Sequence, residues 1–254
     1  MHQSPLEQQF LLVVQTVALV GLCLRMWFTG LHRTYVYFFT YLLLALVQSA
    51  VLGVLPYGSV SYGYAWMATE GPIACFYVLI SVECYTKILS DLAGIQSLSR
   101  RYIKITLSLA ILLAVLLLGL GKTPSGPFGY FHAFERSVVS SVVVFVLLIS
   151  AFLAYYPVPL SRNVIVYSGG YAAYFLAKAA ALLVRNFGNR WDRPINTLLI
   201  AVSTAGLIFW LFALNRQGET KTAVIGHKWQ TGDEERLMSQ LMAINASLSR
   251  SGRK

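Results

Sequence analysis

The chain has 254 residues, of which 57% are hydrophobic and only 12% are charged. A soluble domain carries roughly 25% charged residues, so this composition excludes an ordinary soluble protein and predicts a membrane protein. The net charge of +10 does not indicate a nucleic-acid partner, because the basic residues lie mostly at the ends of apolar segments, where they set orientation in the membrane.

Seven long apolar segments follow one another between residues 8 and 214. A helix needs about 20 apolar residues to cross the hydrocarbon core, and backbone polar groups in lipid must be satisfied within the segment itself. We therefore predict an all-α membrane protein, a seven-transmembrane-helix bundle that occupies residues 1–214. The predicted spans are 8–28, 34–55, 63–90, 103–120, 131–156, 163–185 and 195–214.

The distribution of lysine and arginine predicts the orientation. With the N-terminus outside, the cytoplasmic side holds ten basic residues: Arg25, Arg33, Lys87, Arg100, Arg101, Lys104, Arg162, Arg216, Lys221 and Lys228. The outer side then holds five: Lys122, Arg136, Arg185, Arg190 and Arg193. This ratio favours an outer N-terminus and a cytoplasmic C-terminus in a multi-pass protein of the cell membrane. The outer arginines beside Trp191 have two interpretations, as headgroup anchors or as an attractant for anionic ligands.

Residues 215–254 are predicted to form a cytoplasmic tail that contains a helix at about 231–249. The segment from Thr231 to Glu234 has the spacing of a capping box. An apolar stripe then recurs at helical spacing, formed by Leu237, Leu241, Ile244 and Leu248. An isolated helix of this length is marginal in water, so we expect the stripe to dock on a surface, through self-association or on a cytoplasmic protein.

Polar residues from five predicted spans lie at a similar depth. Glu70 lies about seven residues below the outer end of its span, or roughly 10 Å at 1.5 Å per residue. Lys178, Gln15 and Gln48 lie at about the same distance from the outer ends of theirs, and Glu135 lies at the outer mouth of the fifth span. Charges at membrane depth are costly and commonly mark functional sites.

Helical spacing also places aromatic residues on the faces that carry these charges. Tyr171 and Tyr174 share one stripe with Lys178, and Tyr77 shares one with Glu70. Two interpretations remain open. In the first, these residues line a pocket for a small molecule or an ion. In the second, Glu70 and Lys178 pair only to fasten two helices, and the glutamines bond between helices.

Several classes of function are excluded by missing residues. The last predicted span has no lysine to carry retinal, and the four histidines, His2, His32, His132 and His227, do not form a deep metal site. We expect no cofactor, no metal and no catalytic activity, since no nucleophile–base pair is visible. Glu83 and Lys87, four residues apart, are typical of a structural pair. The layout resembles the seven-helix sensory modules of bacterial signalling proteins, without a shared motif.

The sequence therefore predicts a membrane sensor or binding module that holds its ligand in the outer leaflet half and signals through its inner loops and tail. Two alternatives stay open: a transporter of small solutes, and a structural subunit of a larger membrane complex. A cavity that reaches Glu70 would favour binding.

Overall fold

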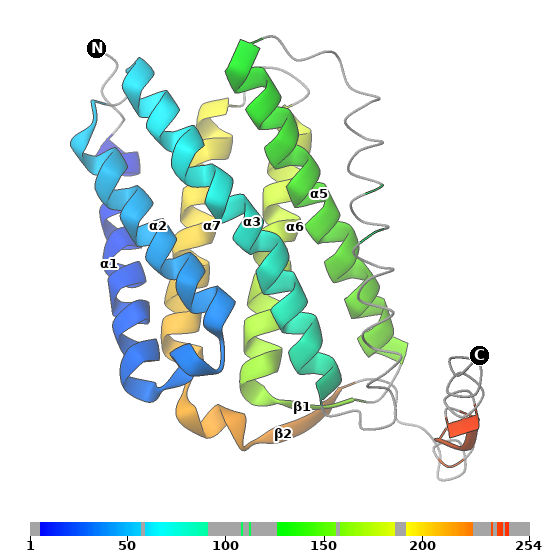
Figure 1. Ribbon diagram of the computed structural model, residues 1–254. Helices are drawn as coiled ribbons and strands as arrows, with labels where there is room; N and C mark the ends of the chain where they lie inside the picture. The colour runs from blue at the N-terminus through cyan, green and yellow to red at the C-terminus, as the bar shows by residue number, and fades with distance from the viewer. Residues whose placement is uncertain are drawn as a thin grey trace, which may run out of the picture.

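Six long α-helices dominate the described part of the computed structural model (Figure 1). They are α1 (Leu6–Thr29), α2 (Val36–Val54), α3 (Val60–Ser90), α5 (Gly126–Tyr155), α6 (Arg162–Arg185) and α7 (Asp192–Ala213). Two 3-10 helices, η1 (Leu31–Arg33) and η3 (Arg216–Glu219), and two strands, β1 (Val158–Ser161) and β2 (Thr222–Ile225), accompany them. The structure describes residues 6–56, 59–90, 108, 112, 126–155, 158–185, 192–225, 235, 238–240 and 242–243.

The six helices form a closed ring. Each packs against its neighbours in the order α1, α2, α3, α5, α6, α7 and back to α1, and α3 also contacts α6 across the ring. Helices α1, α3, α5 and α7 begin at one end of the bundle, here called the cavity end, and the two strands lie at the other, the strand end (Figure 1). Helix α3 thus finishes at the end opposite to the one where α5 begins.

Local sequence signals explain where the helices stop. Gly30 follows α1 with a φ of 76°, a left-handed conformation that glycine adopts without a steric penalty and that commonly terminates helices. Helix α2 ends at Val54, just before Pro56. Pro72 lies inside α3, where it removes one backbone hydrogen bond, a defect that helices in membranes tolerate when neighbouring groups compensate.

Five of the helices are long and apolar enough to cross a membrane: Gln9–Thr29, Val36–Val54, Val60–Ile88, Gly126–Ala151 and Pro194–Ala213. Large apolar side chains such as Phe10, Trp27 and Phe212 are exposed on their outer faces, as lipid contact requires. Helix α6 has 24 residues but is not among the five; it is the least apolar of the six long helices, since it contains three tyrosines, two glycines and Lys178. The count of seven spans stays a prediction, and the predicted span 103–120 lies outside the described residues except for Ser108 and Leu112.

The strand end has regular structure that the sequence analysis did not predict. Strand β1 pairs antiparallel with β2, with Val158 opposite Ile225 and Ser161 opposite Thr222. The first residues of the predicted tail therefore run across the strand end of the bundle and pair with the segment that precedes α6 (Figure 1). Within the predicted helix 231–249, residues 235, 238–240 and 242–243 are helical, whereas Leu237, Leu241, Ile244 and Leu248 lie outside the described residues.

An aromatic layer fills the middle of the bundle. It consists of Phe38, Tyr77, Tyr171, Phe175 and Trp210, each at most 5% exposed. The ring centroids of Phe38 and Trp210 are 5.0 Å apart, and the Phe175 ring lies 4.9 Å from that of Tyr77 and 4.6 Å from that of Tyr171. This layer separates the cavity end from the strand end.

Candidate functional site

Three charged side chains from three helices meet inside the bundle. Lys178 Nζ of α6 lies 2.9 Å from Glu135 Oε1 of α5 and 3.4 Å from Glu70 Oε1 of α3. All three residues are buried, with 6–7% of their surface exposed. A buried charge is tolerated when it is paired and hydrogen-bonded, and here a single ammonium group serves two carboxylates. These three residues are called the charge cluster below.

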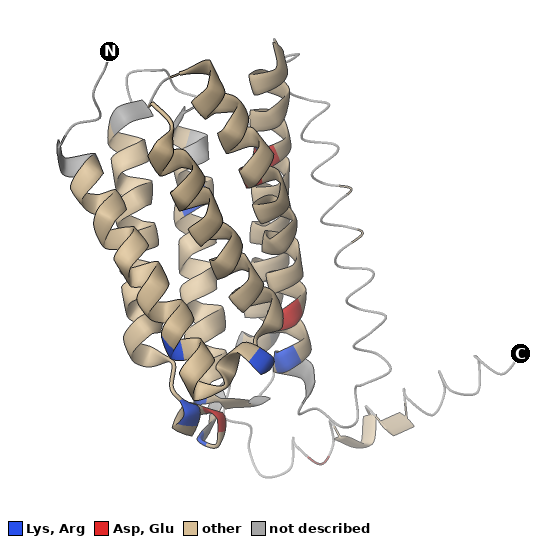
Figure 2. Ribbon diagram, turned by 60° about the vertical axis from the view of Figure 1, so that its left-hand side comes forward, with Lys and Arg blue, Asp and Glu red and all other residues tan. Residues whose placement is uncertain are grey.

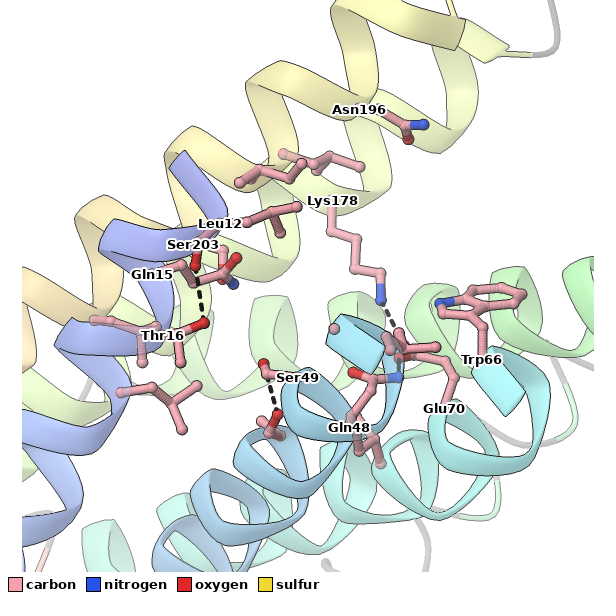
Figure 3. Close-up of a pocket in the computed structure, with 18 of the residues that line it drawn as sticks. Leu12, Gln15, Thr16, Gln48, Ser49, Trp66, Glu70, Lys178, Asn196 and Ser203 are labelled. Atoms are coloured by element: carbon pink, nitrogen blue, oxygen red, sulfur yellow. Dashed lines mark hydrogen bonds and ion pairs between the residues drawn. The ribbon is translucent and has the colours of Figure 1, made fainter. Parts of the chain in front are cut away.

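Neutral side chains also donate hydrogen bonds to Glu70. Tyr77 donates its hydroxyl proton to Glu70 Oε1 at 3.0 Å, and Gln48 Nε2 donates to Glu70 Oε2 at 3.1 Å. Gln48 Nε2 also lies 3.1 Å from Thr69 Oγ1. Lys178 in turn donates to the Tyr77 oxygen at 3.3 Å. Figure 3 shows Lys178 extending from α6 toward Glu70 and Gln48.

A cavity of about 1020 Å³ lies beside the charge cluster, and all six helices contribute to its walls. This volume is at the upper end of the range for small-molecule sites, roughly 300–1,000 Å³. The lining includes end-turn residues of several helices, Gln9, Tyr62, Phe128 and Asn196 among them. The cavity therefore extends from the cavity end of the bundle down to the aromatic layer, where Tyr77 closes it.

The wall opposite the charge cluster is formed by α1 and α7. Gln15 Nε2 of α1 donates to Ser203 Oγ of α7 at 3.0 Å, and Figure 3 shows this pair across the cavity from Lys178. Apolar residues such as Leu12, Val13 and Ile200 of the same two helices also line the cavity. The cavity thus has one charged wall and one largely apolar wall.

Most of the residues that the sequence analysis proposed for the site line this single cavity. Gln15, Gln48, Glu70, Tyr77, Glu135, Tyr174 and Lys178 are all in its lining. Tyr171 lies below the cavity instead, where it donates its hydroxyl to the Tyr77 carbonyl and lies 3.3 Å from Ser81 Oγ. Tyr171 precedes Lys178 by seven residues, or about 10 Å along the helix axis, and so shares its face but not its depth.

A second polar cluster, at the strand end, was not predicted as a unit. Glu83 of α3 accepts hydrogen bonds from the Tyr37 and Phe38 backbone amides at 3.1 and 3.2 Å, and from the Tyr167 hydroxyl at 3.0 Å. The first backbone amides of a helix lack partners within it, and the residue before α2, Tyr35, provides no side-chain cap. Glu83 supplies the missing acceptor and a favourable negative charge at the helix N-terminus. These contacts give Glu83 a structural role, between helices rather than only along α3.

The same end is joined to the segment after α7. Glu219 Oε1 accepts from Tyr35 Oη at 2.8 Å and from Asn163 Nδ2 at 2.7 Å. Asn163 is fully buried and also donates to the Asn215 carbonyl at 2.7 Å. Burial, and then the neighbouring Glu219 carboxylate, raise the pKa of the Tyr35 hydroxyl well above its usual range, which keeps it protonated as the donor. No sequence pattern predicts this cluster, because its members appear only as isolated polar residues next to apolar segments.

The described residues contain no group of three or more histidine, cysteine, aspartate or glutamate side chains that could hold a metal ion. Comparisons with protein-family models, curated proteins and solved structures found no match. The geometry of the cavity is therefore the basis for a functional assignment.

Proposed function

We propose that this protein is a membrane sensor or binding module whose ligand occupies the cavity beside Glu70, Glu135 and Lys178. The observation that carries the proposal is the cavity itself, about 1020 Å³ in volume, with a buried charge cluster in its wall. A pair that served only to fasten helices would be sealed by packing. Here the charged residues are paired and also border the cavity. Lys178 joins α6 to α3 and α5, and all three charged residues line the cavity.

The arrangement of α3 and α6 supports a signalling role. Helix α3 carries Glu70 at the cavity and Glu83 at the strand end, and α6 carries Lys178 and Asn163 in the same way. A ligand that changes the contacts of Lys178 with the two carboxylates would shift α6 against α3. The strand-end contacts of the same two helices would then change, and with them the position of η3 and β2. Coupling of this kind needs an element with two arrangements, and the α3–α6 pair is our candidate.

A cavity-filling substitution tests the proposal. Ser49 lines the cavity, whereas Val47 on the same helix is 55% exposed on the outer face. The protein is purified in lipid nanodiscs and screened for compounds that raise its melting temperature. We expect compounds that stabilise the wild type and Val47→Phe but lose at least tenfold in affinity for Ser49→Phe, because the new ring occupies the ligand volume.

A screen in which no stabilising compound distinguishes Ser49→Phe from Val47→Phe would contradict binding in this cavity. The two variants add the same ring to the same helix, so a general loss of stability would appear in both. The melting temperatures of the two unliganded variants provide that check.

A small-solute transporter is the second candidate, and one observation favours it. The cavity reaches the cavity end of the bundle and stops at the aromatic layer, beneath which Glu83, Asn163 and Glu219 close the strand end. An access path on one side of a closed barrier is the layout of a transporter in one of its two states. Accumulation of a cavity ligand inside proteoliposomes would identify a transporter, and saturable binding without accumulation would identify a sensor or binding module.

A further inference from the structure

The charge cluster has used up its donors. An ammonium group has three N–H donors, and Lys178 Nζ is surrounded by three oxygens: Glu135 Oε1, Glu70 Oε1 and the Tyr77 hydroxyl, at 2.9, 3.4 and 3.3 Å. An anionic ligand would have to take a donor away from a buried carboxylate. Lys178 is therefore poorly placed to receive a carboxylate or phosphate.

The acceptors of the cluster, by contrast, are not exhausted by the contacts among the described residues. A carboxylate oxygen accepts up to two hydrogen bonds. Glu135 Oε2 is paired with His132 Nδ1 at 3.8 Å, which is longer than a hydrogen bond. Glu70 Oε2 receives the Gln48 amide at 3.1 Å and has a second lone pair. The capacity that remains suits a ligand that donates hydrogen bonds.

The charges point the same way. Two carboxylates face one lysine, so the cluster carries one negative charge in excess when all three groups are ionised. A buried charge without a partner is strongly unfavourable. His132 is the basic neighbour of Glu135, but its side chain is 55% exposed at the mouth of the cavity, where water screens charge–charge interactions. A cation bound inside the cavity would neutralise the excess without that screening.

The walls of the cavity fit the rest of such a ligand. Trp66, Tyr41 and Tyr174 line it near the charge cluster, and aromatic faces attract cations. The same attraction is visible within the protein, because Lys178 Nζ lies 4.6 Å from the centroid of the Tyr77 ring. Leu12, Val13 and Ile200 form the apolar side, and a bare metal ion would leave most of the 1020 Å³ empty.

We propose that the cavity selects an organic ammonium ion, a primary or secondary amine attached to an apolar body. The ammonium group donates to Glu135 Oε2 and Glu70 Oε2, and the apolar body lies against α1 and α7. This inference rests on the proposed function, since it names the class of ligand for the same cavity.

Three probes of nearly equal size test the inference: 2-phenylethylamine, 2-phenylethanol and 3-phenylpropanoate. Their binding is measured by isothermal titration calorimetry on the full-length protein in nanodiscs, with empty nanodiscs subtracted to remove partition into lipid. We expect the amine to bind at least tenfold more tightly than the alcohol, and the carboxylate to bind most weakly. Binding of a probe inside the cavity should be lost in Ser49→Phe and kept in Val47→Phe.

Glu135→Gln then tests the role of the charge. Glutamine keeps an oxygen acceptor for Lys178 while removing the excess negative charge. We expect the amine to lose at least tenfold in affinity and the alcohol to change by less than threefold. Glu235→Gln is the matched control, because it alters the net charge of the protein equally at an exposed residue and should leave both affinities unchanged.

The outcomes separate the two proposals. Tighter binding of the alcohol or the carboxylate, abolished by Ser49→Phe, overturns the ammonium inference and leaves the binding function standing. If all three probes fail to bind but the compound screen has found cavity ligands of another class, the ammonium inference is again overturned and the binding function stands. If neither the probes nor the screen distinguish Ser49→Phe from Val47→Phe, both proposals are wrong. The comparison of probes uses the wild-type protein, so the inference can be rejected even if Glu135→Gln fails to fold.

Discussion

Lys178 is held by two carboxylates, and this changes what its removal should do. Glu135 Oε1 is nearer to Lys178 Nζ than Glu70 Oε1 is, at 2.9 Å against 3.4 Å. A variant that neutralises Lys178 alone would leave two buried acids without their cation. Neutralising Glu70 together with Lys178, which the sequence suggests as the balanced change, would still leave Glu135 without its ammonium partner.

We predict that Lys178→Met destabilises the protein by about 3–5 kcal/mol, the cost typical of a buried charge pair that loses one partner. The triple variant with Glu70→Gln and Glu135→Gln added should be less destabilised than Lys178→Met, because no unpaired charge remains. The free energies of unfolding are measured by denaturant titration in mild detergent, with each single variant included. Additive effects among these variants would mean that the three groups do not interact.

Residue-level features differed in how far the sequence could predict them. Counting from the ends of apolar segments placed Glu70, Gln48 and Lys178 at one depth because the rise of a helix is fixed, and the structure brings these three together. Glu135 was expected at the outer mouth of the fifth span, in the same polar layer, but its direct contact with Lys178 was not predicted. The orientation of a side chain around its helix depends on how neighbouring helices pack, which a single sequence does not specify.

At the scale of elements, the contact between α6 and α7 depends on one of two adjacent glycines. A Cβ atom added at Gly170 would lie 2.7 Å from Trp210 Nε1, whereas a Cβ atom at Gly169 would have no neighbour within 4 Å. The indole of Trp210 is nearly buried, and its nitrogen has no hydrogen-bond partner among the described residues. Gly170 therefore permits the close approach that seats Trp210 in the aromatic layer.

We expect Gly170→Ala to lower the free energy of unfolding by about 1–3 kcal/mol, as overpacking of a filled core does. Gly169→Ala is the matched control and should be neutral or stabilising by up to about 1 kcal/mol, because alanine favours the helix. Thermal unfolding in detergent measures both. Equal effects of the two substitutions would show that the contact with Trp210 is not limiting.

The small sheet shows why some elements escaped prediction. Pro157 precedes β1 and Pro159 lies within it. Two prolines this close together indicate a turn. Strands of four residues are too short for a periodic signal. The two strands pair because η3, which precedes β2, is held against the first turn of α6. The hydrogen bond from Asn163 to Glu219 makes this contact. Contacts between residues 56 positions apart leave no local trace in a sequence, whereas the long apolar helices leave a strong one.

At the scale of the whole molecule, the bundle has two unlike ends. Among the described residues, most lysines and arginines gather at the strand end, including Arg25, Arg33, Lys87, Arg162 and Arg216 (Figure 2). The cavity reaches the other end. Cytoplasmic segments are enriched in basic residues, so this distribution predicts an outward orientation for the cavity. Helix α3 finishes at the strand end and α5 begins at the cavity end, and a predicted span between them agrees with this arrangement.

We therefore predict that the strand end is cytoplasmic and that the cavity opens outside the cell. Single cysteines are introduced at Pro56, an exposed residue after α2, and at Thr220, an exposed residue between η3 and β2. The background carries Cys75→Ala, because Cys75 is an exposed native thiol. A membrane-impermeant thiol reagent should modify Pro56→Cys in intact cells and Thr220→Cys only after permeabilisation. The reverse pattern would place the cavity on the cytoplasmic side and the proposed sensor would then read an internal ligand. Labelling of both cysteines in intact cells would contradict a bundle that crosses the membrane, and labelling of the cysteine-reduced parent provides the baseline.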